Sequence, residues 1–162
     1  MKEIEAKIKL EEKEFNRIKK QLGCPRFFNQ YNWILPLENG FLRIRKEKSK
    51  TILTFKSNRE NAKFNQRKEV ETSIKNSKIT EILKNLNVIF YKKKRANAKF
   101  NDCVVSFDIL NKRFYIEIEG KTENIEKTIL LLGLGDYKIE SKSYLEMLCE
   151  NKQDGKWHRQ TK

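Results

Sequence analysis

The sequence predicts an α+β fold: an eight-stranded antiparallel sheet closed into a barrel, or tunnel, with helices packed outside it. Three patterns predict this fold. Several stretches alternate ionisable and apolar residues with period two, as strands do when their two faces differ. Short turns separate most of these stretches, which suits antiparallel neighbours. Amphipathic stretches, with apolar residues three and four positions apart, lie between and after them and predict helices.

The first half of the chain is expected to hold most of the sheet. Residues 2–10 alternate as a strand. Residues 11–22 have the apolar spacing of an amphipathic helix, and Gly23 follows as a C-terminal stop. Further strands are expected at 26–37, 41–46, 51–56 and 64–74.

The second half of the chain is expected to complete the sheet and add helices. A helix is predicted at 77–86 and a long strand at 88–100. Two strands, 103–110 and 113–120, are expected to form a hairpin with its turn at Asn111 and Lys112. The last predicted elements are helices at about 122–132 and 141–150.

No linker or step in composition divides the chain into parts. Residues 1–150 are therefore expected to form a single domain, followed by a basic, disordered tail at 151–162. Lys142 and Tyr144 are expected to cap or pack the last helix of the domain.

The composition limits the kinds of partner that the protein can have. Lysine and arginine number 36 against 22 aspartates and glutamates, a net charge of +14, which favours an anionic partner. One histidine and three widely spaced cysteines argue against a Cys/His zinc site, and the odd cysteine count suits a reducing cytoplasm. The apolar runs are too short to span a bilayer, so no membrane partner is expected.

Charged residues share one face on six of the expected strands. They are Glu3, Glu5 and Lys7; Arg43 and Arg45; Lys56; Arg67, Glu69 and Glu71; Lys93 and Arg95; and Glu117 and Glu119. Asp108 adds a candidate on a further strand. The alternative is an ordinary half-exposed sheet with a solvated outer face. Such faces usually mix in serine, threonine, glutamine and asparagine, whereas these positions are nearly all carboxylates or bases.

A barrel that turns these faces inward needs a ligand to neutralise them, because an unpaired buried ion is costly. Carboxylates on neighbouring strands suit hard divalent cations, which take oxygen ligands. Lysine and arginine opposite them suit phosphates. The pattern therefore indicates a metal-bound polyphosphate as the ligand class.

The charged motifs resemble those of the CYTH proteins, also called triphosphate tunnel metalloenzymes, which include class IV adenylyl cyclases and thiamine triphosphatases. Glu3-x-Glu5-x-Lys7 is similar to their ExExK signature. The later matches, in family order, are Leu42-Arg43-Ile44-Arg45, Thr54-Phe55-Lys56, Arg67-x-Glu69-x-Glu71, Lys93-x-Arg95, Asp108 with Tyr115-Ile116-Glu117-Ile118-Glu119-Gly120, and Ser143-Tyr144-Leu145-Glu146-Met147-Leu148. The resemblance spans roughly residues 1–150, and the family pattern thins at residues 30–35.

The resemblance implies a tunnel that holds a triphosphate with Mg²⁺ or Mn²⁺. Members of the family hydrolyse inorganic triphosphate, thiamine triphosphate, nucleotides or RNA 5′ ends, and the class IV cyclases make cyclic AMP from ATP. We therefore expect a metal-dependent triphosphatase, as a monomer or homodimer. The alternatives are an adenylyl cyclase and a non-catalytic RNA- or polyphosphate-binding module. Paired glutamates argue against the last, because a plain anion-binding groove gains nothing from them.

Together with the chemistry of phosphoryl transfer, the resemblance gives the charged residues their expected roles. The expected triphosphate-binding residues are Lys7, Arg43, Arg45, Lys56, Arg67, Lys93 and Arg95. The expected metal ligands are Glu3, Glu5, Glu117 and Glu119. The expected catalytic residues are Glu5, Lys7, Glu69, Glu71 and Asp108. Of the carboxylates, Glu69, Glu71, Glu117 and Asp108 are expected to form a second metal site or to orient the attacking water.

Overall fold

The structure is a computed structural model that describes residues 2–60, 62–75, 78–86 and 88–150. Its strands are β1 (Lys2–Leu10), β2 (Phe28–Leu37), β3 (Gly40–Glu47), β4 (Lys50–Ser57), β5 (Asn65–Ile74), β6 (Ile89–Phe100), β7 (Cys103–Leu110) and β8 (Arg113–Glu119). Its helices are α1 (Glu12–Gln21), α2 (Ile79–Lys84), α3 (Thr122–Leu131) and α4 (Tyr144–Glu150). None of the helices in this part of the chain has the length and apolar content to cross a membrane.

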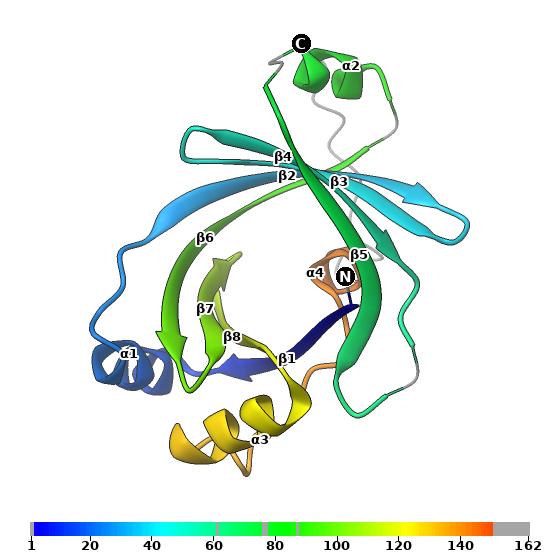
Figure 1. The fold of residues 1–162 in the computed structure, drawn as a ribbon. Coiled ribbons are helices and arrows are strands. Elements are labelled where there is room, and N and C mark those ends of the chain that lie inside the picture. Colours follow the sequence, from blue (N-terminus) through cyan, green and yellow to red (C-terminus); the bar gives the residue numbers. More distant parts are fainter. Residues whose placement is uncertain (1, 61, 76–77, 87, 151–162) are drawn as a thin grey trace.

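The eight strands form one antiparallel sheet in the shape of a ring (Figure 1). In order of hydrogen bonding they run β1-β5-β4-β3-β2-β6-β7-β8. β1 pairs with β5 on one side and with β8 on the other, so the first strand joins the two ends of the series. The predicted α+β class and eight-stranded antiparallel sheet are confirmed.

The predicted boundaries agree with the structure except at two helices. α2 is shorter than the stretch 77–86, whose first residue lies outside the described residues. The last helix begins at Tyr144, three residues after the expected start at Ser141. The predicted tail at 151–162 also lies outside the part of the chain that the structure describes.

Two helices cover the ring from outside, over β1, β7 and β8 (Figure 1). Phe15 of α1 packs edge-on against Phe107 of β7, with ring centroids 5.4 Å apart. Ile125 of α3 and Ile8 of β1 are fully buried in the same core. Burial of each such side chain contributes about 1.5–3 kcal/mol, which explains why these strands have apolar outer faces.

Strand alternation then decides which side chains face the interior of the ring. In β1, Ala6 and Ile8 lie in the core under the helices, so Glu5 and Lys7 point the other way, into the ring. In the register, Lys7 lies opposite Glu117 and Glu5 opposite Glu119, so these two residues of β8 also point into the ring. The charged faces are therefore on the inside.

Helix α4 departs from the expectation that all helices pack outside. Tyr144 and Met147 pack with Ile34 and Tyr91, which are inward-facing residues of β2 and β6. Tyr115 of β8 joins the same cluster. The interior thus has an apolar end that needs a cover, and α4 supplies one (Figure 1).

Candidate active site

A cavity of about 960 Å³ occupies the interior of the ring. It is lined by inward side chains of the sheet and by the start of α4. The predicted residues that line it are Glu3, Glu5, Lys7, Arg43, Arg45, Lys56, Arg67, Glu69, Glu71, Lys93, Arg95, Glu117 and Glu119. The ring therefore brings together residues from six strands, and of the predicted set only Asp108 does not line the cavity.

One side of the cavity is a network of bases and carboxylates from β1, β3, β4 and β5. Lys56 Nζ lies 2.6 Å from a carboxylate oxygen of Glu3 and 3.0 Å from one of Glu69. Arg67 Nε lies 3.8 Å from Glu3, and Arg43 Nη2 lies 3.4 Å from Glu69. Arg43 Nη2 also lies 3.9 Å from Glu71, so three bases and three carboxylates form one connected network on this wall.

The opposite side is built around Asp108 and Glu117. Lys93 Nζ lies 2.7 Å from Asp108, and Arg95 donates hydrogen bonds to both carboxylates. Burial alone would raise the pKa of each carboxyl, but the nearby charges of Arg95 and Lys93 outweigh it and lower both pKa values. Asp108 is fully buried behind the two bases. Its position suits a residue that orients them.

Lys7 extends the second network towards the first. Its Nζ lies 3.2 Å from Glu117 and 3.6 Å from Glu5. Burial by itself lowers the pKa of Lys7, but the attraction of Glu5 and Glu117 is larger in sum and raises it. Lys7 is therefore a protonated base inside the ring, although its side chain is almost wholly buried.

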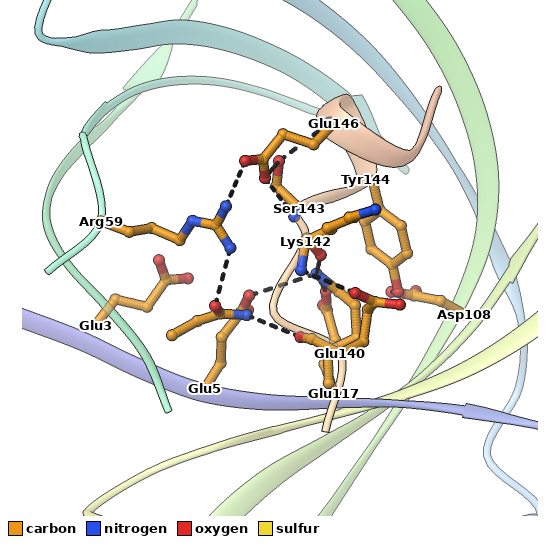
Figure 2. A network of polar contacts seen from close by, with 12 residues as sticks. Glu3, Glu5, Arg59, Asp108, Glu117, Glu140, Lys142, Ser143, Tyr144 and Glu146 are labelled. Atoms are coloured by element: carbon orange, nitrogen blue, oxygen red, sulfur yellow. Dashed lines mark hydrogen bonds and ion pairs between the residues drawn. The ribbon is translucent and has the colours of Figure 1, made fainter. Parts of the chain in front are cut away.

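Tyr144 of α4 is a site residue that the sequence did not reveal, since only packing or capping was expected of it. Its hydroxyl donates a 2.7 Å hydrogen bond to Asp108 (Figure 2). Lys7 Nζ and Lys93 Nζ each lie 4.3 Å from the centre of its ring. Burial and the charge of Asp108 raise its pKa well above the ordinary value, so the hydroxyl keeps its proton. The sequence did hold a signal for Tyr144, because the residue belongs to the family-like motif that begins Ser143-Tyr144. The motif alone did not say which residue the tyrosine contacts.

A capping box and an arginine hold α4 in place (Figure 2). The backbone N–H and hydroxyl of Ser143 each donate a 2.7 Å hydrogen bond to Glu146, and the Glu146 N–H donates back to the Ser143 hydroxyl. Arg59, from the β4–β5 connection, pairs with Glu146 and donates a 3.2 Å hydrogen bond to Asn65. Sequence patterns did not single out Arg59, because it belongs to no alternating strand.

The segment before α4 is tied to β1 through its backbone. The N–H of Glu140 donates a 2.7 Å hydrogen bond to the carbonyl of Lys7, and Ile139 forms an isolated bridge with Ile8. Lys7 Nζ also donates to the carbonyl of Lys142 at 3.3 Å. The strand that carries Glu5 and Lys7 thus also positions the helix that covers the cavity.

Most of the charged side chains that are buried deepest in the interior are bases. Burial, followed by repulsion from Arg95, lowers the pKa of Lys93 to about 7. Burial and then Arg43 lower that of Arg45 to about 10. Buried Nε atoms of Arg43 and Arg67 have no hydrogen-bond acceptor among the described residues. Oxygen atoms of an anionic ligand would supply acceptors for both.

Glu3, Glu5 and Glu119 are close neighbours on the inner face where β1 meets β8. Glu5 lies directly opposite Glu119, and Glu3 follows two positions along β1. Burial, then repulsion from Glu3 and Glu5, raises the pKa of Glu119 to about 6. A cation bound here would relieve this repulsion. No three acidic, histidine or cysteine side chains in the described ranges already surround a metal position, so a cation would need further oxygen ligands.

The chain is thus an α+β protein whose antiparallel ring sheet encloses paired carboxylates and buried bases. The chain belongs to the CYTH domain family, whose model matches residues 1–146. The resemblance drawn from the motifs is confirmed. Membership in this family implies a divalent metal ion.

Solved structures with the same fold include two archaeal proteins. A conserved hypothetical protein from Pyrococcus furiosus is 25% identical, with a TM-score of 0.73, over 89% of this chain and 98% of that one. The PH1819 protein from Pyrococcus horikoshii is 23% identical, with a TM-score of 0.71, over 92% and 99%.

A plant protein from Hippeastrum also has this fold. It is adenylyl cyclase-like and is described as having a dominant triphosphatase activity. It is 16% identical, with a TM-score of 0.69, over 92% of this chain and 96% of that one. No curated protein sequence matches the chain.

Proposed function

We propose that this protein is a divalent-metal-dependent triphosphatase that binds inorganic, nucleoside or thiamine triphosphate in a closed tunnel formed by the ring. The observation that carries the proposal is the set of buried bases that surround one cavity, with two arginine Nε atoms that lack acceptors in the described part of the chain. A triphosphate has several anionic oxygens in a row and matches such a set better than a single phosphate does.

Bases on the two walls of the cavity bind opposite ends of the triphosphate. Lys56, Arg67 and Arg43 hold one end of the triphosphate, next to Glu3 and Glu69. The other end is bound by Lys7, Lys93, Arg45 and Arg95. Asp108 and Tyr144 act through Lys93 and Arg95, which they hold in position. Positioning of this kind supplies much of the rate enhancement in phosphoryl transfer.

Glu3, Glu5 and Glu119 are the residues that would hold the divalent cation. Their carboxylates already repel one another, as the pKa of Glu119 indicates. Glu117, the fourth expected ligand, lies next to them on β8, where Lys7 and Arg95 bind it. A bound Mg²⁺ or Mn²⁺ supplies charge neutralisation on the phosphate oxygens.

Glu69 and Glu71 are placed to orient the attacking water. Both line the cavity on β5, and the side chain of Glu71 is 45% exposed, which leaves it open to water. Glu71 also accepts a 3.1 Å hydrogen bond from Thr54, which fixes one of its oxygens. A water held by these carboxylates would face the triphosphate from the β5 side.

The Hippeastrum protein shares the fold and is described by both a cyclase name and a triphosphatase activity, so product analysis is the test. The protein is incubated with Mg²⁺ or Mn²⁺ and, in turn, tripolyphosphate, ATP, thiamine triphosphate and 5′-triphosphorylated RNA. Orthophosphate release from any of them supports the proposal. Formation of cyclic AMP and pyrophosphate from ATP, without orthophosphate release, would replace it with the cyclase function.

Two variants test whether hydrolysis takes place in the cavity. Glu5→Gln removes one carboxylate charge from the cavity, and Glu38→Gln removes one from an exposed turn. We expect Glu5→Gln to lower kcat/KM at least tenfold and Glu38→Gln to leave it unchanged. Equal rates for both variants, or no turnover of any substrate by the unmodified protein, would reject the proposal.

A further inference from the structure

The outer face of β6, β2 and β3 lies away from α1 and α3, which cover the ring over β1, β7 and β8 (Figure 1). At the centre of this outer face are six outward-pointing residues that we call the open face: Tyr31, Trp33, Lys46, Phe90, Lys92 and Lys94. They alternate with inward-facing residues such as Asn32 and Arg45, so strand geometry directs them out of the ring.

Two of the three aromatic residues of the open face are in contact, and the third lies on the same face of β2. Trp33 lies opposite Phe90 in the register, with ring centroids 5.3 Å apart. Tyr31, two positions along β2, lies between Lys92 of β6 and Lys46 of β3. Lys92 Nζ lies 5.3 Å from the centre of the Tyr31 ring. Phe90 is 44% exposed, a large fraction for an aromatic side chain with an aromatic neighbour.

The charge of this surface has one sign. At the outward positions of the described strands β2, β3 and β6 the charged residues are Lys46, Lys92 and Lys94, and no carboxylate is among them. All three lysines are exposed. The carboxylate of β3 that could neutralise them, Glu47, points into the ring, where it binds Gln30. The open face therefore selects an anionic partner.

We infer that the open face binds single-stranded nucleic acid, with bases stacked on Tyr31, Trp33 and Phe90 and phosphates against the three lysines. Exposed aromatics on a sheet with basic side chains around them provide a stacking platform for unpaired bases. A duplex hides its bases from such a platform. A second copy of this chain would set lysines against lysines, and an acidic peptide would leave the aromatic rings without stacking partners. The inference is independent of the proposed function, because these side chains lie outside the cavity.

The test measures binding of an oligouridylate of about 12 nucleotides, a length within the range that comparable sheets bind. It carries a 5′-hydroxyl, so it offers no triphosphate to the cavity, and a 3′ fluorophore for anisotropy. We expect binding that weakens as salt increases, and weaker binding of the same sequence in a duplex. Excess tripolyphosphate at constant ionic strength should not displace the strand.

Variants of the open face then locate the site. Phe90→Ala should weaken binding by about five- to 160-fold, the range for loss of one stacked base. Lys92→Gln with Lys94→Gln should reduce the slope of log affinity against log salt by about 1.4, since each phosphate contact to a single strand contributes about 0.7. The matched control is Lys13→Gln with Lys20→Gln, which removes the same charge from exposed positions of α1.

Thermal unfolding of each variant shows whether it is folded. The inference is overturned if folded Phe90→Ala and the open-face lysine variant bind as the unmodified protein does. Two further results would overturn it. One is displacement of the strand by tripolyphosphate, which would place binding in the cavity. The other is a dimer, seen by sedimentation, that Trp33→Lys converts to a monomer.

Discussion

A single phenol group, that of Tyr144, connects the covering helix to the wall of the cavity that is built around Asp108 and Glu117. Its hydroxyl contacts Asp108, and its ring lies next to two lysine side chains from different strands. Asp108 in turn accepts from Arg95. The arrangement orients bases without placing Tyr144 or Asp108 against a reacting atom, so their loss should affect binding more than the chemistry.

We expect Tyr144→Phe to lower the free energy of unfolding by about 1–3 kcal/mol, because it removes a buried hydrogen bond to a carboxylate but keeps the ring. KM for tripolyphosphate should rise several-fold with a smaller change in kcat. Chemical denaturation and steady-state kinetics measure the two effects. Tyr137→Phe, at an exposed tyrosine, is the control and should change neither. Equal effects of the two variants would contradict this role for Tyr144.

The pKa of Lys93 gives the cavity a dependence on pH. Because this pKa is lowered to about 7, the side chain is charged below that pH and loses its charge as pH rises. Affinity for tripolyphosphate, measured by calorimetry without metal, should therefore fall between about pH 6 and about pH 8. The ligand titrates too, so the comparison is with Lys93→Met, whose affinity should change less over this range. Identical pH profiles would show that Lys93 does not titrate there.

At the level of elements, α4 is held by few contacts compared with the strands that it covers. Its capping box closes its own first turn. The ion pair of Glu146 with Arg59 ties it to the β4–β5 connection, and its apolar side packs in the interior cluster. A short helix has little stability of its own, so these contacts decide whether it stays over the cavity.

Ser143→Ala removes both the hydroxyl that bonds Glu146 and the cap of the first turn of α4. We expect a loss of about 1 kcal/mol in the free energy of unfolding, the usual cost of a lost cap. Ser141→Ala changes an exposed serine just before the cap and should stay within about 0.5 kcal/mol of the unmodified protein. Denaturant titration of both variants measures the difference. Matching losses would mean that the cap does not stabilise α4.

Much of each element could be predicted because the period of two separates charged from apolar faces. Alternation put Glu5 and Lys7 on one face, and the nearly pure charge of six such faces favoured the inside of a barrel; both residues line the cavity. The position of α4 could not be predicted, because an apolar stripe does not tell whether a helix packs inside or outside a ring. The burial of Asp108 behind Lys93 depends on the register of three strands, which local patterns do not specify.

At the level of the whole molecule, bases and carboxylates from six strands face one cavity, and some like charges in it, such as those of Lys93 and Arg95, repel each other. Their mutual repulsion is an energetic cost of the folded state, and a polyanion that binds only this state would remove part of it. Stability should therefore respond to ligand much more than it responds to any one surface substitution.

Tripolyphosphate at about 100 times its dissociation constant should raise the free energy of unfolding by about 2.7 kcal/mol. Thermal denaturation in the presence of a chelator measures this stabilisation without metal, so that only the bases contribute to it. Orthophosphate at equal ionic strength is the control. The chelator should also abolish hydrolysis, and added Mg²⁺ or Mn²⁺ should restore it. Hydrolysis that continues after complete metal removal would contradict the assignment of Glu3, Glu5 and Glu119.

The pairing of β1 with both β5 and β8 has a consequence for how the protein is made. β1 leaves the ribosome before all other strands, whereas β8 leaves after them. Until β8 emerges, one edge of β1 lacks its partner, and Glu5 and Lys7 lack Glu119 and Glu117. Contacts between such distant parts of a chain form slowly. The sheet and the site are therefore completed in the same late step of folding, and a nascent chain stalled before β8 has neither.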